Sequence, residues 1–274
     1  MTMYLRRRAQ FSAGFLNAPA GGTGGGHNYL VELTVGGAID PRSGMVVNIT
    51  DVDAVLKAKV VRPLDGALLD RDVPAFRDTP PTPENVARFV WHQCGPAMPP
   101  ASRLARVTLR PLPTLWTELT TLDPRLPTTK GDSPVLTVTR AYDFSASHRL
   151  HSLSLSDAEN REIFGKCNWE NGHGHNYEVE VTLAGAPDPK TGLLFAPETL
   201  DAAVDVEVLQ PYDHRHLNYD APEFRDLNPT SENLTRVIWD KLSRRLASAD
   251  LGGARLYRVA VRETARNYFE YFGE

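Results

Sequence analysis

Cysteine is scarce in this chain: Cys94 and Cys167 are the only two among 274 residues. Two cysteines are too few for a disulfide framework, and their scarcity is typical of a reducing cytoplasm. The chain also lacks an apolar run of the roughly 18 residues that a membrane span needs, and the apolar core of a signal peptide. Its formal net charge of -4 provides no basic excess of the kind that binds nucleic acid. We therefore expect a cytoplasmic protein that binds neither membranes nor nucleic acid.

The main chemical signal is a pair of histidines, His173 and His175, separated by one glycine. In an extended segment residues i and i+2 point to the same face, so the two imidazoles lie side by side and can chelate a metal ion. Catalytic zinc usually takes three protein ligands and keeps one position open. The best third ligand is His148, at the end of the preceding strand-like segment, and His151 is the reserve. The residues thus predict a mononuclear metal site.

Three further groups are candidates for proton transfer. Cys167 lies six positions before His173, and a thiolate near a cation has a lowered pKa; the alternative is a buried, inert thiol. In Asp213-His214 a carboxylate can orient an imidazole and raise its basicity, although the segment also fits an ordinary polar loop. Glu170, three residues before His173, is either an acid/base or a solvated loop acid.

These segments, together with two near the C-terminus, resemble the 6-pyruvoyltetrahydropterin synthase and 6-carboxytetrahydropterin synthase family. The motifs cover about residues 135–274 in the family's order: FSASHRLHS, GKCNWENGHGHNYEVEVTL, PYDHRHLN, NPTSENLTRVIWDKL and RVAVRETARNYFEYF. The resemblance implies a T-fold, a zinc ion (Zn2+) held by three histidines, and a substrate of the dihydroneopterin triphosphate type.

The resemblance also implies roles for single residues. Cys167 would abstract a proton from the substrate side chain, and Asp213 and His214 would act with it. In one arrangement that the resemblance allows, this pair and Cys167 come from different subunits. Glu263 would anchor the pterin, since a carboxylate can accept two hydrogen bonds from its amino-pyrimidinone edge. Glu170 departs from the pattern, because some relatives carry a glutamate there in place of the cysteine. Cys167, Glu170 or both could therefore serve as the acid/base.

The first half of the chain is a copy of the second at a constant offset of 148 positions. His27-Asn28-Tyr29 matches His175-Asn176-Tyr177, and the register holds without a gap from there to Trp91 and Trp239. Such a register over some sixty residues indicates internal duplication.

The first copy has lost most of the candidate site. Phe15 stands for His148, Gly25 for His173, Gly66 for His214 and Pro111 for Glu263, so that only His27 survives of the three ligands. We expect a degenerate copy without a metal site at residues 1–122, a linker at 123–134 and a catalytic unit at 135–274. An alternative is that the first copy binds another ligand through the glycine run at 21–26.

The patterning predicts an α+β fold of two tandem T-fold units, each β-β-α-α-β-β, with a four-stranded antiparallel sheet and two helices on one face. In the second unit one helix begins near Pro197 and another follows Thr230, a good N-cap. By resemblance, sheet edges pair between units to close barrels. The expected assembly is a homo-oligomer, either a homotrimer with six T-fold units or something larger.

The leading functional prediction is a zinc-dependent lyase that forms 6-pyruvoyltetrahydropterin from 7,8-dihydroneopterin triphosphate by triphosphate elimination. Two other products stay open: 6-carboxytetrahydropterin on the path to queuosine and other 7-deazaguanine nucleosides, and 6-hydroxymethyl-dihydropterin for folate. Two other classes are a non-catalytic pterin-binding protein and a zinc hydrolase that has no need of Cys167.

Overall fold

A computed structural model describes residues 2–17, 23–126 and 134–274. The chain forms two compact units. Unit 1 comprises Met1–Thr139 with Ala184–Phe195 and Gly252–Ala254, and unit 2 comprises Arg140–Leu183, Ala196–Leu251 and Arg255–Glu274. The linker expected at 123–134 lies largely outside the described residues, as does the start of the glycine run at 21–26. Within the described ranges, no helix is both long and apolar enough to cross a membrane.

Unit 1 contains a sheet in the order β1-β2-β3-β4, made of β1 (Thr2–Asn17), β2 (Thr23–Ala38), β3 (Ser102–Leu112) and β4 (Leu115–Thr120). Each neighbouring pair is antiparallel. Alternate residues of β2, namely Tyr29, Val31, Leu33 and Val35, are fully buried, as the period-2 pattern predicts.

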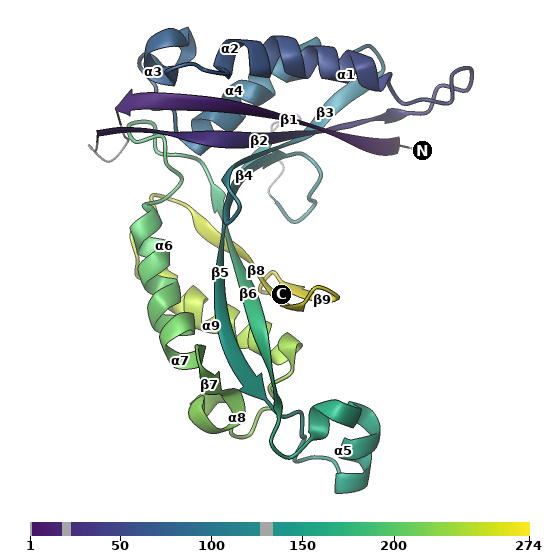
Figure 1. Ribbon diagram of the computed structural model, residues 1–274, viewed down its shortest axis with the longest axis vertical. Coiled ribbons are helices and arrows are strands. Elements are labelled where there is room, and N and C mark those ends of the chain that lie inside the picture. Colours follow the sequence, from purple (N-terminus) through teal and green to yellow (C-terminus); the bar gives the residue numbers. More distant parts are fainter. Residues whose placement is uncertain (1, 18–22, 127–133) are drawn as a thin grey trace. The chain divides into compact units, whose positions relative to one another are not determined.

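Helices cover one face of the unit 1 sheet (Figure 1). They are α1 (Ile49–Leu56), α2 (Arg62–Leu64), α3 (Leu69–Asp72) and α4 (Pro83–Cys94), with short 3-10 turns at Pro74–Phe76 and Gly95–Ala97. The N-cap of α4 is Thr82, whose hydroxyl accepts a hydrogen bond from the Asn85 amide at 3.2 Å. Cys94 is fully buried, and burial raises the pKa of its thiol to about 12, which fits an inert structural residue.

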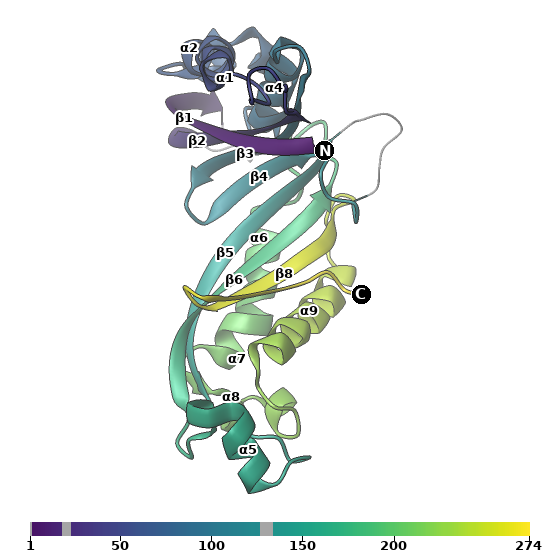
Figure 2. The ribbon, with the colours of Figure 1, turned by 90° about the vertical axis from the view of Figure 1, so that its right-hand side faces the viewer.

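Unit 2 has a sheet in the order β5-β6-β8-β9, with β7 pairing parallel to β5. The strands are β5 (Val135–His148), β6 (His173–Gly185), β7 (Arg215–His216), β8 (Arg255–Thr264) and β9 (Asn267–Tyr271). Figure 2 shows α6 (Pro197–Val204), α7 (Gln210–Tyr212) and α9 (Ser231–Ala247) along one face of this sheet. The apolar side chains of Leu200, Leu234, Ile238 and Leu242 are fully buried there, whereas Val237 is only half-buried.

Both units interrupt their first long helix with a π-helical turn at the same place in the repeat. The turns are Lys57–Val61 and Asp205–Leu209, and each is followed two residues later by a proline, Pro63 or Pro211. Proline has no N–H to donate and its ring displaces the carbonyl one turn earlier, so the helix widens locally. The shared irregularity supports the duplication and was not predicted.

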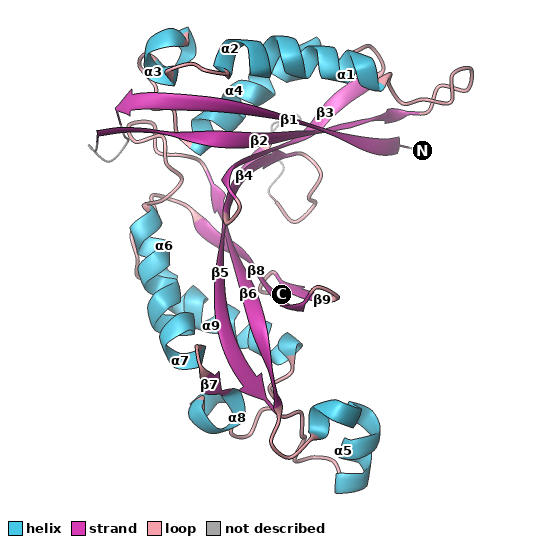
Figure 3. Ribbon diagram, viewed as in Figure 1, coloured by secondary structure: helices cyan, strands magenta, loops and turns pink. Residues whose placement is uncertain are grey.

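The segment between β5 and β6 is longer than its equivalent in the first copy, and it contains helical structure (Figure 3). It contains α5 (Asp157–Phe164) and a 3-10 turn at Gly165–Asn168. Ser156 and Glu159 form a capping box at the start of α5. Two short helical segments, α8 (Leu217–Asp220) and a 3-10 turn at Pro222–Phe224, follow β7. The α+β prediction is confirmed, but each unit contains more helical segments than the predicted two.

Candidate metal centre

Three histidines come together at one end of unit 2. His148 is the last residue of β5, and His173 and His175 open β6. One ring nitrogen of each lies within 4.8 Å of the others. The ring centroids are 4.7 to 5.2 Å apart. Across the described ranges this is the one cluster of three or more His, Cys, Asp or Glu side chains suited to hold a metal ion. The structure thus gathers all three residues that the sequence proposed as ligands.

The surroundings of these histidines fit a bound metal ion. His148 Nε2, His173 Nδ1 and His175 Nε2 are buried without a hydrogen-bond partner, which is costly unless a ligand satisfies them. The other nitrogen of His148 lies 2.7 Å from the carbonyl of Pro229, an acceptor that places the proton on Nδ1 and leaves Nε2 free to coordinate. Burial lowers the pKa of His148 to about 4, so its imidazole is neutral at physiological pH. A neutral imidazole is the form that binds metal.

Glu263 lies beside the triad. Its Oε1 is 3.8 Å from Nε2 of His148 and 3.8 Å from Nε2 of His175. Ser231 Oγ and Asn267 Nδ2 each donate a hydrogen bond of 2.8 Å to its carboxylate. Although burial opposes ionisation, these two hydrogen bonds lower the pKa of Glu263. A charged carboxylate therefore faces the same space as the histidine nitrogens, an arrangement that β8 and the start of α9 impose together.

Cys167 lies on the 3-10 turn that precedes β6, and its side chain is half-buried. Its carbonyl accepts a hydrogen bond of 2.8 Å from the amide of Leu150, which ties the turn to the end of β5. Asn168, which sequence reasoning missed, strengthens the tie by donating to the carbonyl of Leu150 at 2.7 Å. Burial and the charge of Glu263 raise the pKa of the Cys167 thiol. Without a cation nearby, this thiol is therefore protonated at neutral pH.

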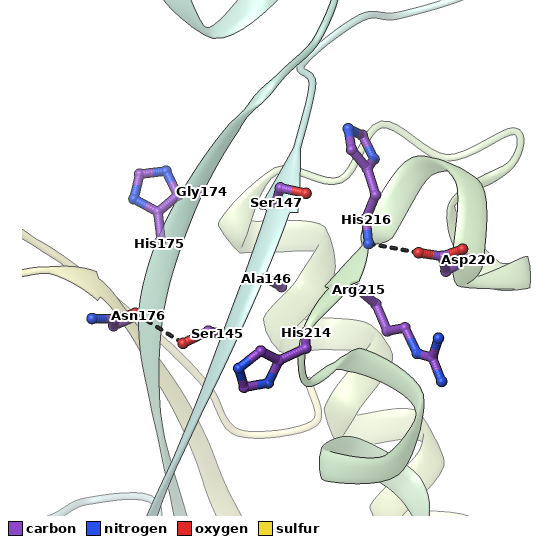
Figure 4. A pocket seen from close by; sticks show the side chains of 10 residues that line it. All are labelled: Ser145, Ala146, Ser147, Gly174, His175, Asn176, His214, Arg215, His216 and Asp220. Atoms are coloured by element: carbon purple, nitrogen blue, oxygen red, sulfur yellow. Dashed lines mark hydrogen bonds between the residues drawn. The ribbon is translucent and has the colours of Figure 1, made fainter.

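Asp213 and His214 form a pair at the edge of the sheet, beside β5. Asp213 Oδ2 lies 2.9 Å from Nδ1 of His214, and the imidazole is 83% exposed. The backbone amide of Ser145, and after it His214, lower the pKa of Asp213. Figure 4 shows His214 and His175 among the residues that line one cavity. His214 lines that cavity, but among the described residues it forms no hydrogen bond, ion pair or ring contact with His148 or His173.

The first copy repeats the backbone around this pair without the imidazole. Asp65 accepts a hydrogen bond from the Ser12 amide at 2.8 Å, as Asp213 does from Ser145 at 2.9 Å. Gly66 has a φ of 73°, and His214 has a φ of 56° at the same position. The carboxylate thus has a structural role in both copies, and the histidine is the residue that only the second copy carries.

Glu170 lies in a different cavity. It is exposed, and it lines a hollow with Arg149, Arg161, Asn168 and others, apart from the cavity that contains His175 and His214. The reserve ligand His151 is also outside the triad, with Nδ1 3.1 Å from the amide nitrogen of Asn168. Neither residue is brought to the three histidines in the described chain.

The first copy has an aromatic contact where the second has the triad. Phe15 lies with its ring centroid 6.3 Å from that of His27, which in turn packs edge-on against Tyr29 at 5.5 Å. Burial lowers the pKa of His27. No cluster of potential metal ligands is recorded in the described part of this copy.

Two units of this kind, each with antiparallel strands and helices on one face, and a triad of histidines that could hold a metal ion define a tandem T-fold protein. The chain belongs to the 6-pyruvoyl tetrahydropterin synthase family, whose model matches residues 6–121 and again 137–274. Both the predicted resemblance and the duplication are thereby confirmed.

Individual relatives match about half of the chain but most of their own length. A 6-pyruvoyl tetrahydrobiopterin synthase of Homo sapiens is 46% identical over 137 residues, which are 50% of this chain and 91% of that protein. A 6-carboxy-5,6,7,8-tetrahydropterin synthase of Bacillus subtilis (strain 168) is 31% identical over 134 residues, 47% of this chain and 86% of that protein. The solved structure of Caenorhabditis elegans 6-pyruvoyl tetrahydropterin synthase is 42% identical, covers 52% of this chain and 97% of that chain, and has a TM-score of 0.48.

Proposed function

We propose that this protein is a zinc-dependent lyase that converts 7,8-dihydroneopterin triphosphate to 6-pyruvoyltetrahydropterin with elimination of triphosphate. One observation carries the proposal: three partnerless imidazole nitrogens lie together, and two of them are 3.8 Å from a charged Glu263, in a chain of this family. The imidazole nitrogens would hold a metal ion, and the Glu263 carboxylate would recognise a pterin.

His148, His173 and His175 would hold the metal, and zinc suits them because neutral imidazole nitrogens are among its preferred ligands. Bound there, zinc would supply Lewis acidity that makes a neighbouring substrate proton easier to remove. The Pro229 carbonyl keeps His148 in the coordinating tautomer.

The remaining residues would bind the substrate and move protons. Glu263, held by Ser231 and Asn267, would accept hydrogen bonds from the amino-pyrimidinone edge of the pterin and set its orientation. Cys167 would take the side-chain proton once a nearby cation favours its thiolate. Asp213 would orient His214, which would give or take a proton at an exposed position.

The pyruvoyl product is favoured over the carboxy product by the relatives. Identity is 46% to the human protein named for the first and 31% to the Bacillus subtilis protein named for the second. The hydroxymethyl product would need Glu170 as the acid/base, and Glu170 lines a separate cavity. Residues 1–122 would serve as a degenerate, non-catalytic copy, and 135–274 would carry the reaction in a cytoplasmic homo-oligomer, a trimer or larger.

Product analysis by mass spectrometry tests the proposal. The zinc-loaded protein should consume dihydroneopterin triphosphate and release 6-pyruvoyltetrahydropterin, and His173→Ala should abolish turnover while leaving the fold intact. If the product were a carboxy or hydroxymethyl pterin, the proposed roles of the metal and of Glu263 would stand, and the proposed reaction would be wrong. Absence of consumption by the zinc-loaded protein would favour a pterin-binding role. Full activity in Cys167→Ala would rule out the thiolate base and favour hydrolysis by activated water.

A further inference from the structure

Unit 1 contains a contact between a turn and a helix N-terminus that the duplication should produce twice. The turn at residues 188–194 packs on the start of α4. There the Thr82 hydroxyl donates a hydrogen bond to the carbonyl of Gly192 at 2.7 Å. The amide of Leu194 donates to the carboxylate of Glu84 at 3.0 Å. Glu84 is only 4% exposed, and Thr82 only 1%, so the turn covers this helix start completely.

In the first copy, the turn at residues 40–46 is the equivalent of the turn at 188–194. The two turns have the same internal structure. The Gly44 amide donates to the Asp40 carbonyl at 2.8 Å, just as Gly192 donates to Asp188 at 2.8 Å. Gly44 has a φ of 71° and Gly192 a φ of 73°. The turn at 40–46 therefore already has the shape that docks on a helix start.

The start of α9 is, in the same way, the equivalent of the start of α4. Thr230 accepts from the Asn233 amide at 3.3 Å, as Thr82 accepts from Asn85 at 3.2 Å. The Asn233 side chain donates to a carbonyl five residues earlier at 2.8 Å, as that of Asn85 does at 2.9 Å. Glu232 occupies the position of Glu84. The receiving surface is thus also preformed.

The two equivalent surfaces differ from the paired ones in being uncovered. Glu232 is exposed, and within the described chain its carboxylate has no hydrogen-bond or ion-pair partner. Gly44 is exposed where Gly192 is buried, and a Cβ on Gly44 would meet no atom within 4 Å. Met45, next in the turn, is 46% exposed. One chain therefore contains one complete contact between a turn and a helix start. It also contains a second turn and a second helix start that are both uncovered.

We propose that the turn at 40–46 of a second copy of this chain docks on the start of α9. The Thr230 hydroxyl donates to the carbonyl of Gly44, and the amide of Val46 donates to the Glu232 carboxylate. The contact is heterologous, because a turn of one copy meets a helix of the next, and such contacts assemble into closed rings when the rotation permits. Every ring then contains an even number of T-fold units.

This surface lies beside the candidate metal centre of unit 2. Thr230 stands between Pro229, whose carbonyl accepts from His148, and Ser231, whose hydroxyl donates to Glu263. Docking of a second copy thus orders the same stretch of backbone that fixes a metal ligand and the carboxylate next to it. The inference rests on the repeat and the hydrogen bonds, and does not depend on the proposed reaction.

Sedimentation velocity over a range of protein concentrations tests the proposal with the full chain. Glu232→Ala removes the acceptor, and Glu198→Ala is the matched control, because Glu198 is also an exposed acid in the first turn of a helix. A hydrogen bond to a charged group, when lost, weakens association on the order of tenfold or more per contact. Glu232→Ala should dissociate at correspondingly higher concentration, and Glu198→Ala should assemble like the unmodified chain.

A second variant tests the turn. Met45→Glu brings a carboxylate towards Glu232, so it should weaken assembly in the unmodified chain and weaken it less in a chain that also carries Glu232→Ala. A monomeric unmodified chain at micromolar concentration would overturn the proposal. So would equal assembly of Glu232→Ala and Glu198→Ala. Intact assembly of Glu232→Ala with a raised KM for the pterin would also overturn it, by assigning Glu232 to the substrate. An unmodified chain that assembles, with assembly weakened by Glu232→Ala, but that leaves dihydroneopterin triphosphate unconsumed would count against the proposed reaction alone.

Discussion

His214 holds a left-handed backbone conformation, with a φ of 56°, that residues with a side chain rarely adopt. Its equivalent in the first copy is Gly66, which adopts the same conformation at a φ of 73° without steric cost. Such strain at a histidine that lines the cavity suggests that the imidazole is kept for function at the expense of stability. Comparing two substitutions at this position separates these contributions.

His214→Gly and His214→Ala both remove the imidazole, and they differ in the backbone. Both variants lose the pair with Asp213, which is worth no more than about 1 kcal/mol because both side chains are substantially exposed. Only glycine relieves the left-handed strain, which costs about 1–2 kcal/mol for a residue with a Cβ. Glycine also has more conformational freedom in the unfolded chain, which lowers the stability of the folded state by up to roughly 1 kcal/mol. We expect His214→Gly to be more stable than His214→Ala by about 1 kcal/mol, and both to lose most of their turnover.

Urea denaturation of the zinc-loaded protein measures the stability difference, and single-turnover kinetics measures the activity. Gly66→Ala is the reciprocal control: a Cβ at Gly66 would meet no atom within 4 Å, so any loss of stability there reports the backbone alone. It should cost about 1 kcal/mol and leave turnover unchanged. The reasoning fails if His214→Ala is as stable as His214→Gly, or if either variant keeps full activity.

Three further predictions concern the metal centre and the core of unit 1. Zinc should lower the raised pKa of Cys167, so alkylation of the thiol by iodoacetamide at fixed neutral pH should be faster with zinc than without it. Gly172→Ala should weaken zinc binding and lower stability by more than about 1 kcal/mol, because its Cβ would lie 2.5 Å from the carbonyl oxygen of His148. Zinc affinity is measured by calorimetric titration. The control is Gly165→Ala, because Gly165 also has a positive φ but its Cβ would lie in open space. Burial raises the pKa of Glu84 above its ordinary value, so its contribution to stability is lost as pH rises through the folded pKa. The stability advantage of Glu84→Gln, measured by denaturation, should therefore grow as pH rises above the ordinary pKa of a glutamate and then level off.

Each of these has a clear contrary result. An alkylation rate that zinc leaves unchanged would place the thiol too far from the metal to act as a base. Equal zinc affinities for the Gly172 and Gly165 variants would mean that the His148 carbonyl moves aside without cost. A pH-independent difference between Glu84→Gln and the unmodified chain would show that the Glu84 carboxyl is ionised alike in the folded and unfolded states.

Local patterns in the sequence were sufficient for the repeat, the start of two helices and the pairing of His173 with His175. The constant offset of 148 positions needs only residue identities. The predicted start of a helix near Pro197 and the cap at Thr230 depend on residues within one turn, and both are observed. His173 and His175 share a face because a strand has a period of two. Each of these conclusions rests on interactions between near neighbours in the chain.

The tertiary structure alone decided which distant groups meet. Glu263 lies 3.8 Å from His148 across 115 positions of sequence, and no periodicity encodes that approach. Glu170 is only three residues from His173, yet it lines a different cavity. Gly172, between them, has a positive φ that turns the chain. The equivalent helix starts at Glu84 and Glu232 differ in burial because, within the chain, a turn packs on the first of them only. The sequence by itself determined the parts and their chemistry, and packing between segments far apart in the chain determined which of them act on one another, because burial and long-range contacts depend on the whole fold rather than on local spacing.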